Sequence, residues 1–192
     1  MSRTMQKQKE TPFSSLEKLV LAFATYAHRN QVRKYTNEPY INHCIAVAQM
    51  VKLYGGTEEM VCAALLHDTV EDTEISVDNL MSFFSSLRIP EKSAMQIGQF
   101  VEWLTDQFTK DAYPELNRRQ RKEQELLRLS KSSSAVQTIK YCDMINNAST
   151  IGNYSPEFAK VYLQENLDLL AVMDKGDPEL RKIALDLAAQ ES

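Results

Sequence analysis

The residues best suited to chemistry stand at the end of an apolar segment. Apolar residues dominate from Val61 to Leu66, and the run His67-Asp68-Thr69-Val70-Glu71-Asp72 follows. On a helix, residues three and four apart are neighbours, so these imidazole and carboxylate groups share one surface. Unpaired carboxylates are costly to bury, and such a cluster therefore indicates a metal, a charged partner or a cleft. We expect His67 and Asp68 to bind a metal, with Glu71 and Asp72 one turn further on for proton transfer.

A solvated helix C-terminus is the alternative interpretation of this segment. It fits poorly, because acidic groups there oppose the helix dipole and the preceding residues are strongly apolar. Two distant residues favour a metal. His43 is one of only three histidines, and Asp143 lies inside the apolar segment 136–145, where a carboxylate needs a partner such as a cation. Imidazole and carboxylate donors suit Mn²⁺, Fe²⁺ or Zn²⁺.

The bulk composition is that of one soluble domain. The chain has 192 residues, 43% hydrophobic and 25% charged, with few Gly and Pro, which favours helices. With a net charge of −4, the chain lacks the overall positive charge typical of proteins that bind a nucleic acid polymer. No signal peptide or membrane-spanning stretch is recognisable, so we expect no membrane association. Three cysteines without CxxC spacing indicate buried free thiols and a cytoplasmic setting.

Helical periodicity runs along most of the chain, and no segment alternates as a strand does. The sequence predicts an all-α helical bundle of about eight to ten helices, with a loose tail at 1–12 and a single domain at 13–192. Ser14-x-x-Glu17 has the form of a capping box, and Gly55-Gly56 ends the second helix. Expected helices include 57–72, 114–129, 135–148, a helix from 156 to about 174, and a last one from Pro178.

The order His43, His67-Asp68, Asp143 resembles that of the HD metal-dependent phosphohydrolases. Several blocks are similar to the hydrolase domain of RelA/SpoT-type enzymes and the stand-alone small alarmone hydrolases. These blocks are FATYAHRNQVRK (23–34), EPYINH (38–43), AALLHDTVEDT (63–73), VEWLTDQFTK (101–110) and IKYCDMINN (139–147). The resemblance extends from about residue 16 to 175, nearly the whole chain.

This resemblance implies an all-helical, Mn²⁺-dependent enzyme that removes the 3′-pyrophosphate from the guanosine alarmones ppGpp and pppGpp, leaving GDP or GTP. Fe²⁺ or Zn²⁺ would suit the same donors. The implied roles are His43, His67, Asp68 and Asp143 as metal ligands, Glu71 and Asp72 as the catalytic acidic pair, and Arg33, Lys34, Asn147 and Tyr162 as nucleotide-binding residues. The family usually has Ala-Asp-Lys around the last ligand, whereas this chain has Cys142-Asp143-Met144. A positive charge beside the site is therefore missing, which affects the choice of nucleotide.

Two alternatives stay open from the sequence. One is an HD phosphohydrolase acting on another 3′- or 2′-phosphorylated nucleotide, such as an NADPH phosphatase. The other is a non-catalytic nucleotide-binding or antitoxin-like module, which the presence of Glu71 and Asp72 disfavours. A functional pairing with an alarmone synthetase is a further expectation. We expect the basic stretch 118–122 to be a solvated helix face and His28 to be structural.

Overall fold

A computed structural model describes residues 12–34, 36–154 and 156–189, so the tail predicted at 1–12 lies almost wholly outside the described residues. The described chain is all-α, as predicted, and holds ten helices. They are α1 (Ser15–Ala27), α2 (Ile41–Leu53), α3 (Glu58–Leu66), α4 (Thr69–Asp72), α5 (Val77–Ser86), α6 (Glu91–Leu104), α7 (Arg118–Leu129), α8 (Ser134–Tyr154), α9 (Pro156–Val172) and α10 (Pro178–Ala189). Within the described residues, no helix is both long and apolar enough to cross a membrane.

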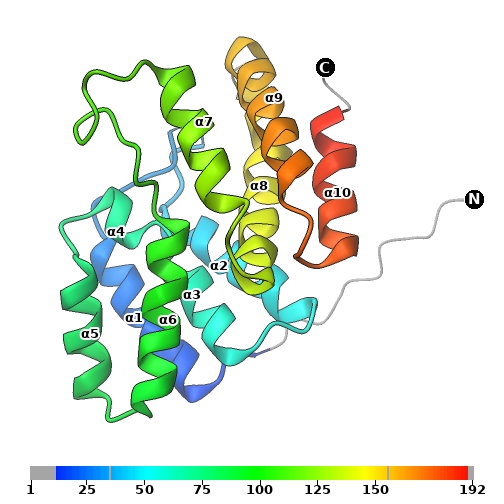
Figure 1. The fold of residues 1–192 in the computed structure, drawn as a ribbon. Coiled ribbons are helices and arrows are strands. Elements are labelled where there is room, and N and C mark those ends of the chain that lie inside the picture. Colours follow the sequence, from blue (N-terminus) through cyan, green and yellow to red (C-terminus); the bar gives the residue numbers. More distant parts are fainter. Residues whose placement is uncertain (1–11, 35, 155, 190–192) are drawn as a thin grey trace, which may run out of the picture.

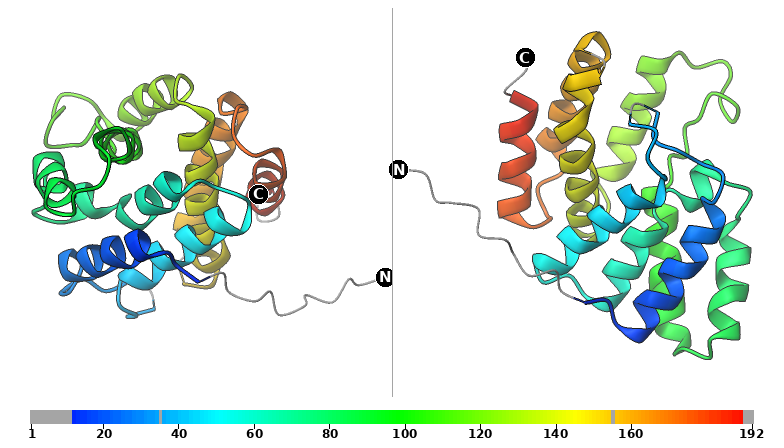
Figure 2. Two further views of the ribbon diagram at one scale, coloured as in Figure 1. Left: turned by 90° about the horizontal axis from the view of Figure 1, so that it is seen from below. Right: turned by 180° about the vertical axis from the view of Figure 1, so that it is seen from behind.

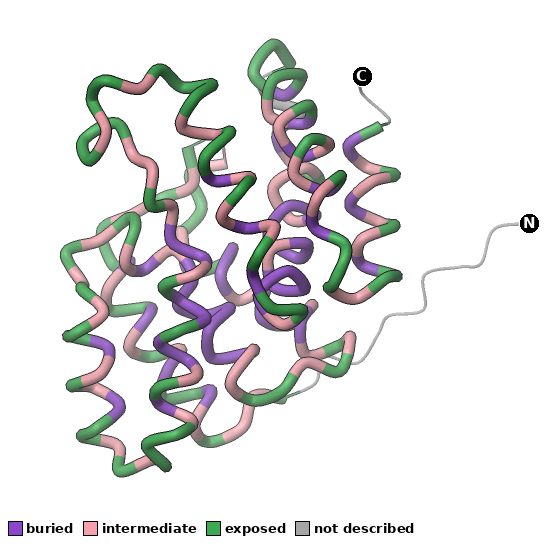
Figure 3. Tube along the Cα trace, in the orientation of Figure 1, coloured by how far each residue is buried: buried purple, intermediate pink, exposed green. Residues whose placement is uncertain are grey.

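Helices α2, α3 and α8 form the centre of the bundle (Figure 1). Helix α3 packs against α1, α2 and α6, while α8 packs against α2, α9 and α10. Figure 2 shows α8 between α2 and the α9–α10 pair. The buried positions concentrate along the inner helices (Figure 3), with Leu65, Leu66 and Ile139 fully enclosed. The centre of the core is therefore the place where α2 packs against α3 and α8, and residues of the predicted site lie on or next to all three helices.

Local sequence signals set many of the helix boundaries. Ser14 and Glu17 form the predicted capping box, in which each side chain accepts the other residue's backbone N–H. Thr57 caps α3 by accepting the N–H of Met60. Gly55 has a φ of 77°, a left-handed conformation that glycine adopts without a Cβ penalty, and so ends α2 as predicted.

The predicted helix 57–72 is wrong at its functional end, because the helix is interrupted there. Helix α3 stops at Leu66, and α4 begins at Thr69. Between them, Asp68 has φ −97° and ψ −2°, in the sparsely populated bridge region. A continuous helix would point the two side chains about 100° apart. The break instead brings His67 Nε2 within 3.0 Å of Asp68 Oδ2.

Two other boundaries also differ from the prediction. Helix α7 begins at Arg118 rather than at 114, because the Asn117 side chain accepts the N–H of Gln120 and caps the helix there. Helix α8 continues beyond Ala148 to Tyr154. The longer α8 carries the residues that follow Asp143 along one side of the pocket described below.

A tight connection holds α10 against α8. The Tyr141 hydroxyl donates to the Met173 carbonyl at 2.6 Å, and Asp177 N donates to Thr138 Oγ1 at 2.9 Å. A Cβ on Gly176 would collide with the Tyr141 ring and lie 2.9 Å from the backbone nitrogen of Thr138. Only a residue without a side chain fits this close approach.

We expect Gly176→Ala to lower the free energy of unfolding by about 1 to 3 kcal/mol, because Tyr141 and the backbone of α8 would have to move. Gly98→Ala is the matched control. Its Cβ would meet only Met81 Sδ, at 3.1 Å, and alanine is the better helix former. Denaturant unfolding of both variants checks this, and a Gly176→Ala protein as stable as Gly98→Ala would contradict it.

Candidate active site

Two buried histidines, one from α2 and one from the end of α3, face each other. The Nδ1 of His67 bonds to the Ala64 carbonyl at 2.7 Å, and the Nδ1 of His43 lies 2.6 Å from Asn146 Oδ1. Each of these acceptors favours a proton on Nδ1, which leaves Nε2 as the free donor atom. The two Nε2 atoms point inward and lie 3.2 Å apart. The rings are therefore oriented as metal ligands are in proteins.

Two carboxylates complete this cluster. Asp68 Oδ2 lies 3.0 Å from His67 Nε2 and 3.5 Å from His43 Nε2. From α8, Asp143 Oδ1 lies 3.2 Å from His43 Nε2 and 3.7 Å from His67 Nε2. The Tyr40 hydroxyl donates to Asp68 at 2.8 Å and fixes that carboxylate. The structure thus brings together all four residues that the resemblance implied as ligands.

The donor atoms fit a divalent metal ion. Those of His43, His67 and Asp68 all lie within 4.8 Å of one another. An ion bonded to nitrogen and oxygen at about 2.0 to 2.2 Å places neighbouring donors about 3 to 3.5 Å apart. The separations of the imidazole nitrogens from each other and from Asp68 lie in this range. The three side chains could therefore hold a metal ion without large movement.

Strong mutual electrostatics act inside the cluster. Burial by itself would lower the pKa of His67, but the carboxylates of Asp68 and Asp143 raise it to about 10. Burial would likewise raise the pKa of Asp143, yet Lys140 and the two imidazoles hold it well below its usual value. The carboxylates therefore stay ionised in the core, as a cation-binding site requires.

Lys140 is a site residue that the sequence analysis missed. Its Nζ lies 2.9 Å from Asp143 Oδ2, and its side chain is only 21% exposed. The missing lysine at 144 had suggested that the site lacks a positive charge. That expectation is incomplete, because Lys140 places an ammonium group on the same helix, one turn before Asp143. A charged residue three positions before a buried aspartate was the available signal.

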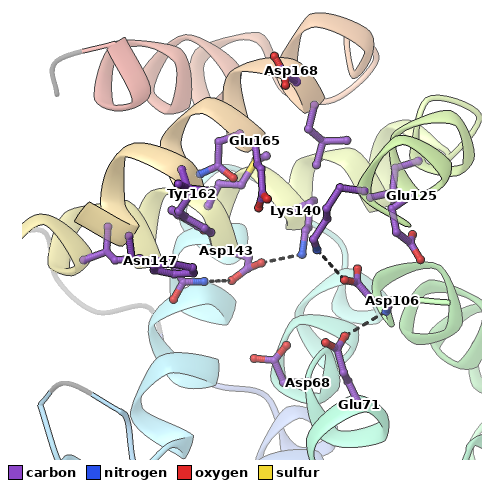
Figure 4. A pocket seen from close by; sticks show the side chains of 18 of the residues that line it. Asp68, Glu71, Asp106, Glu125, Lys140, Asp143, Asn147, Tyr162, Glu165 and Asp168 are labelled. Carbon is purple, nitrogen blue, oxygen red and sulfur yellow. Dashed lines mark hydrogen bonds and ion pairs between the residues drawn. The ribbon is translucent and has the colours of Figure 1, made fainter. Parts of the chain in front are cut away.

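Glu71 and Asp72 occupy different environments. Glu71 lines the pocket, and its Oε2 accepts the backbone N–H of Asp106 at 3.0 Å (Figure 4). Desolvation and the nearby Asp106 carboxylate raise the pKa of Glu71. Asp72 instead accepts a hydrogen bond from Gln31 at 2.9 Å. Of the predicted acidic pair, the geometry places Glu71 at the pocket wall, while Asp72 pairs with the loop before α2.

The cluster opens into a pocket of about 850 Å³. All four predicted nucleotide-binding residues, Arg33, Lys34, Asn147 and Tyr162, line it. Asn147 joins two of the groups, since it donates to Asp143 Oδ1 at 2.7 Å and accepts from Arg33 at 2.9 Å. Burial and Asp143 raise the pKa of Tyr162 to about 12, so its hydroxyl remains a donor. His28, as expected, is outside the cluster and contacts Gln31 and Thr69.

Helix α7 forms a wall of the pocket, and its basic face is largely exposed, as expected, while also lining the cavity. Arg118, Arg119 and Lys122 all line the cavity. Arg118 makes two hydrogen bonds with Glu165 of α9, at 2.9 and 2.8 Å, and Lys122 lies 2.9 Å from Asp106 Oδ2. Arg118 and Arg119 fit the expectation of a solvated face, because their side chains are 52% and 88% exposed. The sequence spacing of α7 could not show that its charged face lines a cavity, because a helix face over an open cavity is as polar as one in bulk solvent.

Comparison with known proteins agrees with the fold. The HD domain family model matches residues 20–173. The chain is 32% identical over 158 residues to the mouse protein guanosine-3′,5′-bis(diphosphate) 3′-pyrophosphohydrolase MESH1, covering 80% of each chain, and the human MESH1 gives the same values. A probable enzyme of the same name from Synechocystis is 31% identical, and the match spans 78% of this chain and 18% of that protein.

A solved structure shows the same fold. The structure described as a metazoan ortholog of SpoT that hydrolyzes ppGpp superposes with a TM-score of 0.77, covering 92% of this chain and 96% of the other at 24% identity. Together with the family match, this defines the class of protein: the chain belongs to the HD domain family. Within that family, the stretch of about 158 residues shared with MESH1 contains every residue of the cluster.

We expect a divalent ion, added as Mn²⁺ to metal-stripped protein, to raise the melting temperature. At a concentration a hundred times its dissociation constant, the ion stabilises the fold by about 2.7 kcal/mol, or roughly 5 to 10 °C for a chain of this size. His67→Ala should abolish this shift. His28→Ala should start from a lower melting temperature but keep the shift, because His28 lies outside the cluster. An unchanged shift in His67→Ala would contradict the assignment.

Proposed function

We propose that this chain hydrolyses the 3′-pyrophosphate of guanosine alarmones, converting ppGpp or pppGpp to GDP or GTP and pyrophosphate. One observation carries the proposal: a histidine–aspartate cluster and Glu71 share a single pocket, in a chain 32% identical to MESH1 over most of its length. The pocket volume of about 850 Å³ suits a nucleotide with several phosphates.

The metal ligands in this proposal are His43, His67, Asp68 and Asp143, and the ion is Mn²⁺. Asp143 is included because its Oδ1 approaches both imidazoles from the opposite helix. Mixed nitrogen and oxygen donors also accept Fe²⁺ or Zn²⁺. When bound, the divalent ion polarises the phosphoryl group and acidifies a water molecule. The hydrogen bonds to Ala64 and Asn146 hold the imidazoles ready for it.

Glu71 is the proton acceptor in this mechanism. Water attacks the phosphorus attached to the ribose 3′-oxygen and gives a proton to Glu71. The bond between this phosphorus and the 3′-oxygen breaks. The 3′-oxygen leaves with a proton from solvent or a nearby acid. Burial and the Asp106 carboxylate raise the pKa of Glu71, which makes it a stronger base than an exposed glutamate. Asp72 lies behind the site, where it accepts a hydrogen bond from the Gln31 amide nitrogen. The Gln31 amide oxygen in turn contacts His28 Nδ1.

The nucleoside lies against Arg33, Lys34, Asn147 and Tyr162. Arg33 suits a phosphate oxygen or base carbonyl because it presents a planar fork of donors, and Lys34 adds a point charge. Asn147 and Tyr162 offer polar contacts to the ribose or base beside Asp143. We also propose a cytoplasmic setting, consistent with three buried free thiols, and a functional pairing with an alarmone synthetase that makes the substrate.

Purified protein with Mn²⁺ should release pyrophosphate from ppGpp, measured by an enzyme-coupled assay. Parallel reactions with NADPH and with nucleoside 3′-monophosphates distinguish the related phosphohydrolases, because those substrates would release phosphate. Glu71→Gln keeps the acceptor for the Asp106 N–H but removes the base, so kcat should fall about 10² to 10⁴-fold. Glu74→Gln, nearby and exposed, is the control. A wild-type protein that binds ppGpp but releases nothing would support the non-catalytic alternative instead.

The pH dependence of hydrolysis gives a separate prediction. Glu71 must be ionised to accept a proton, so the rate falls as the pH drops through its pKa. Asp106→Asn removes a negative charge that raises this pKa, while its backbone N–H still bonds Glu71 and Lys140 still lowers the pKa. The acidic limb of kcat/KM should therefore move to lower pH, by at most about one unit. Asp111→Asn, exposed in the same loop, should leave the limb in place. A limb that moves to higher pH in Asp106→Asn would contradict the role of Glu71.

A further inference from the structure

Residues that follow one another along helix α8 line successive parts of the pocket. Lys140, Asp143 and Asn147 follow one another at spacings of three and four, so they share one face, and all three line the cavity. Asn147 belongs to the nucleoside end, where it contacts Arg33. Asp143 belongs to the metal cluster in the middle. Lys140 therefore lies on the far side of the reacting phosphorus from the nucleoside.

A second ammonium group reaches the same end of the pocket from α7. Lys122 Nζ lies 2.9 Å from Asp106 Oδ2, and Lys140 is the strongest of the charges that lower the pKa of Asp106. Asp106 thus stands between two lysines from different helices. Its backbone N–H also holds Glu71, so the two cations are tied to the proposed base. Asp106 pairs with Lys122 and Asp143 pairs with Lys140, so an anion that enters this end of the pocket has to share the two lysines with these carboxylates.

Met144, the residue after Asp143, lines the pocket and carries no charge. The cations at this end therefore come from Lys140 and Lys122. Lys140 is largely committed to Asp143, whereas Lys122 is 42% exposed on a flexible stem and can move to an incoming anion.

We propose that Lys122 and Lys140 form a subsite for the terminal phosphate of the 3′-diphosphate group. The subsite rests on the proposed function. A 3′-diphosphate that is bound by its nucleoside at Asn147 and by its first phosphate at the metal cluster extends its second phosphate toward these lysines. After the bond to the 3′-oxygen breaks, the released pyrophosphate remains in contact with the same lysines, while the nucleotide product does not touch them.

Product inhibition by pyrophosphate and by GDP tests this subsite in the metal-loaded enzyme. Lys122→Met keeps the length of the side chain and removes its charge, so inhibition by pyrophosphate should weaken about tenfold. Inhibition by GDP, which lacks the 3′-diphosphate, should stay unchanged. Lys131→Met, an exposed position just after α7, is the matched control, and Lys122→Arg should restore pyrophosphate inhibition. The free metal concentration is held fixed, because pyrophosphate binds divalent ions in solution.

The other outcomes overturn the subsite. If Lys122→Met weakened inhibition by GDP alone, Lys122 would bind the 5′-phosphates instead. Equal weakening of inhibition by GDP and by pyrophosphate would indicate a general structural effect. No change in either inhibition would show that Lys122 takes no part in ligand binding. Wild-type protein that hydrolyses no ppGpp would refute the proposed function itself. In that case, inhibition by pyrophosphate is measured in the wild type and in Lys122→Met with whichever phosphorylated nucleotide the enzyme does cleave. Equal inhibition in the two proteins would overturn the subsite independently of the proposed function.

Discussion

The structure depends on keeping the Asp143 carboxylate ionised inside an apolar helix. Its side chain is 7% exposed, and an isolated charge there would be strongly destabilising. Lys140 on the same helix and the two imidazoles from α2 and α3 provide the compensating charge and donors. These contacts require α2, α3 and α8 to meet at one point, which is where the buried core lies. The same charge balance that permits the fold therefore builds the cation site.

Backbone geometry, more than side-chain packing, aims the ligands. The interruption between α3 and α4 turns Asp68 toward His67, and the Ala64 carbonyl fixes the ring of His67. Tyr40 then holds Asp68 from the start of α2. Each ligand is thus supported by a second contact, so the cluster retains its geometry while the pocket beside it stays open to a ligand.

Local patterns in the sequence were sufficient for the helices and for the chemical types at the site. Capping residues such as Ser14 and Thr57 act within one turn, and an aspartate in an apolar segment predicts a charged partner. The break at Asp68 was not predictable, because no Gly or Pro lies beside it to mark the end of a helix. The meeting of Asp106 with Lys122 and with Glu71 was equally hidden, since it joins a loop to two helices and arises only from their packing. The role of Asp72 as a catalytic residue stays a prediction.

The positive charge beside Asp143 comes from two different helices. A lysine at 144 would supply its charge from the same rigid helix as Asp143. Here that position is a buried methionine that adds to the core, and the charge is divided between Lys140 on α8 and Lys122 on α7. In the proposed subsite, Lys122 is held by Asp106, so phosphate binding there would depend on how α7 packs against the loop that carries Asp106. Substitutions in α7 would then alter this end of the pocket without disturbing the histidine–aspartate cluster.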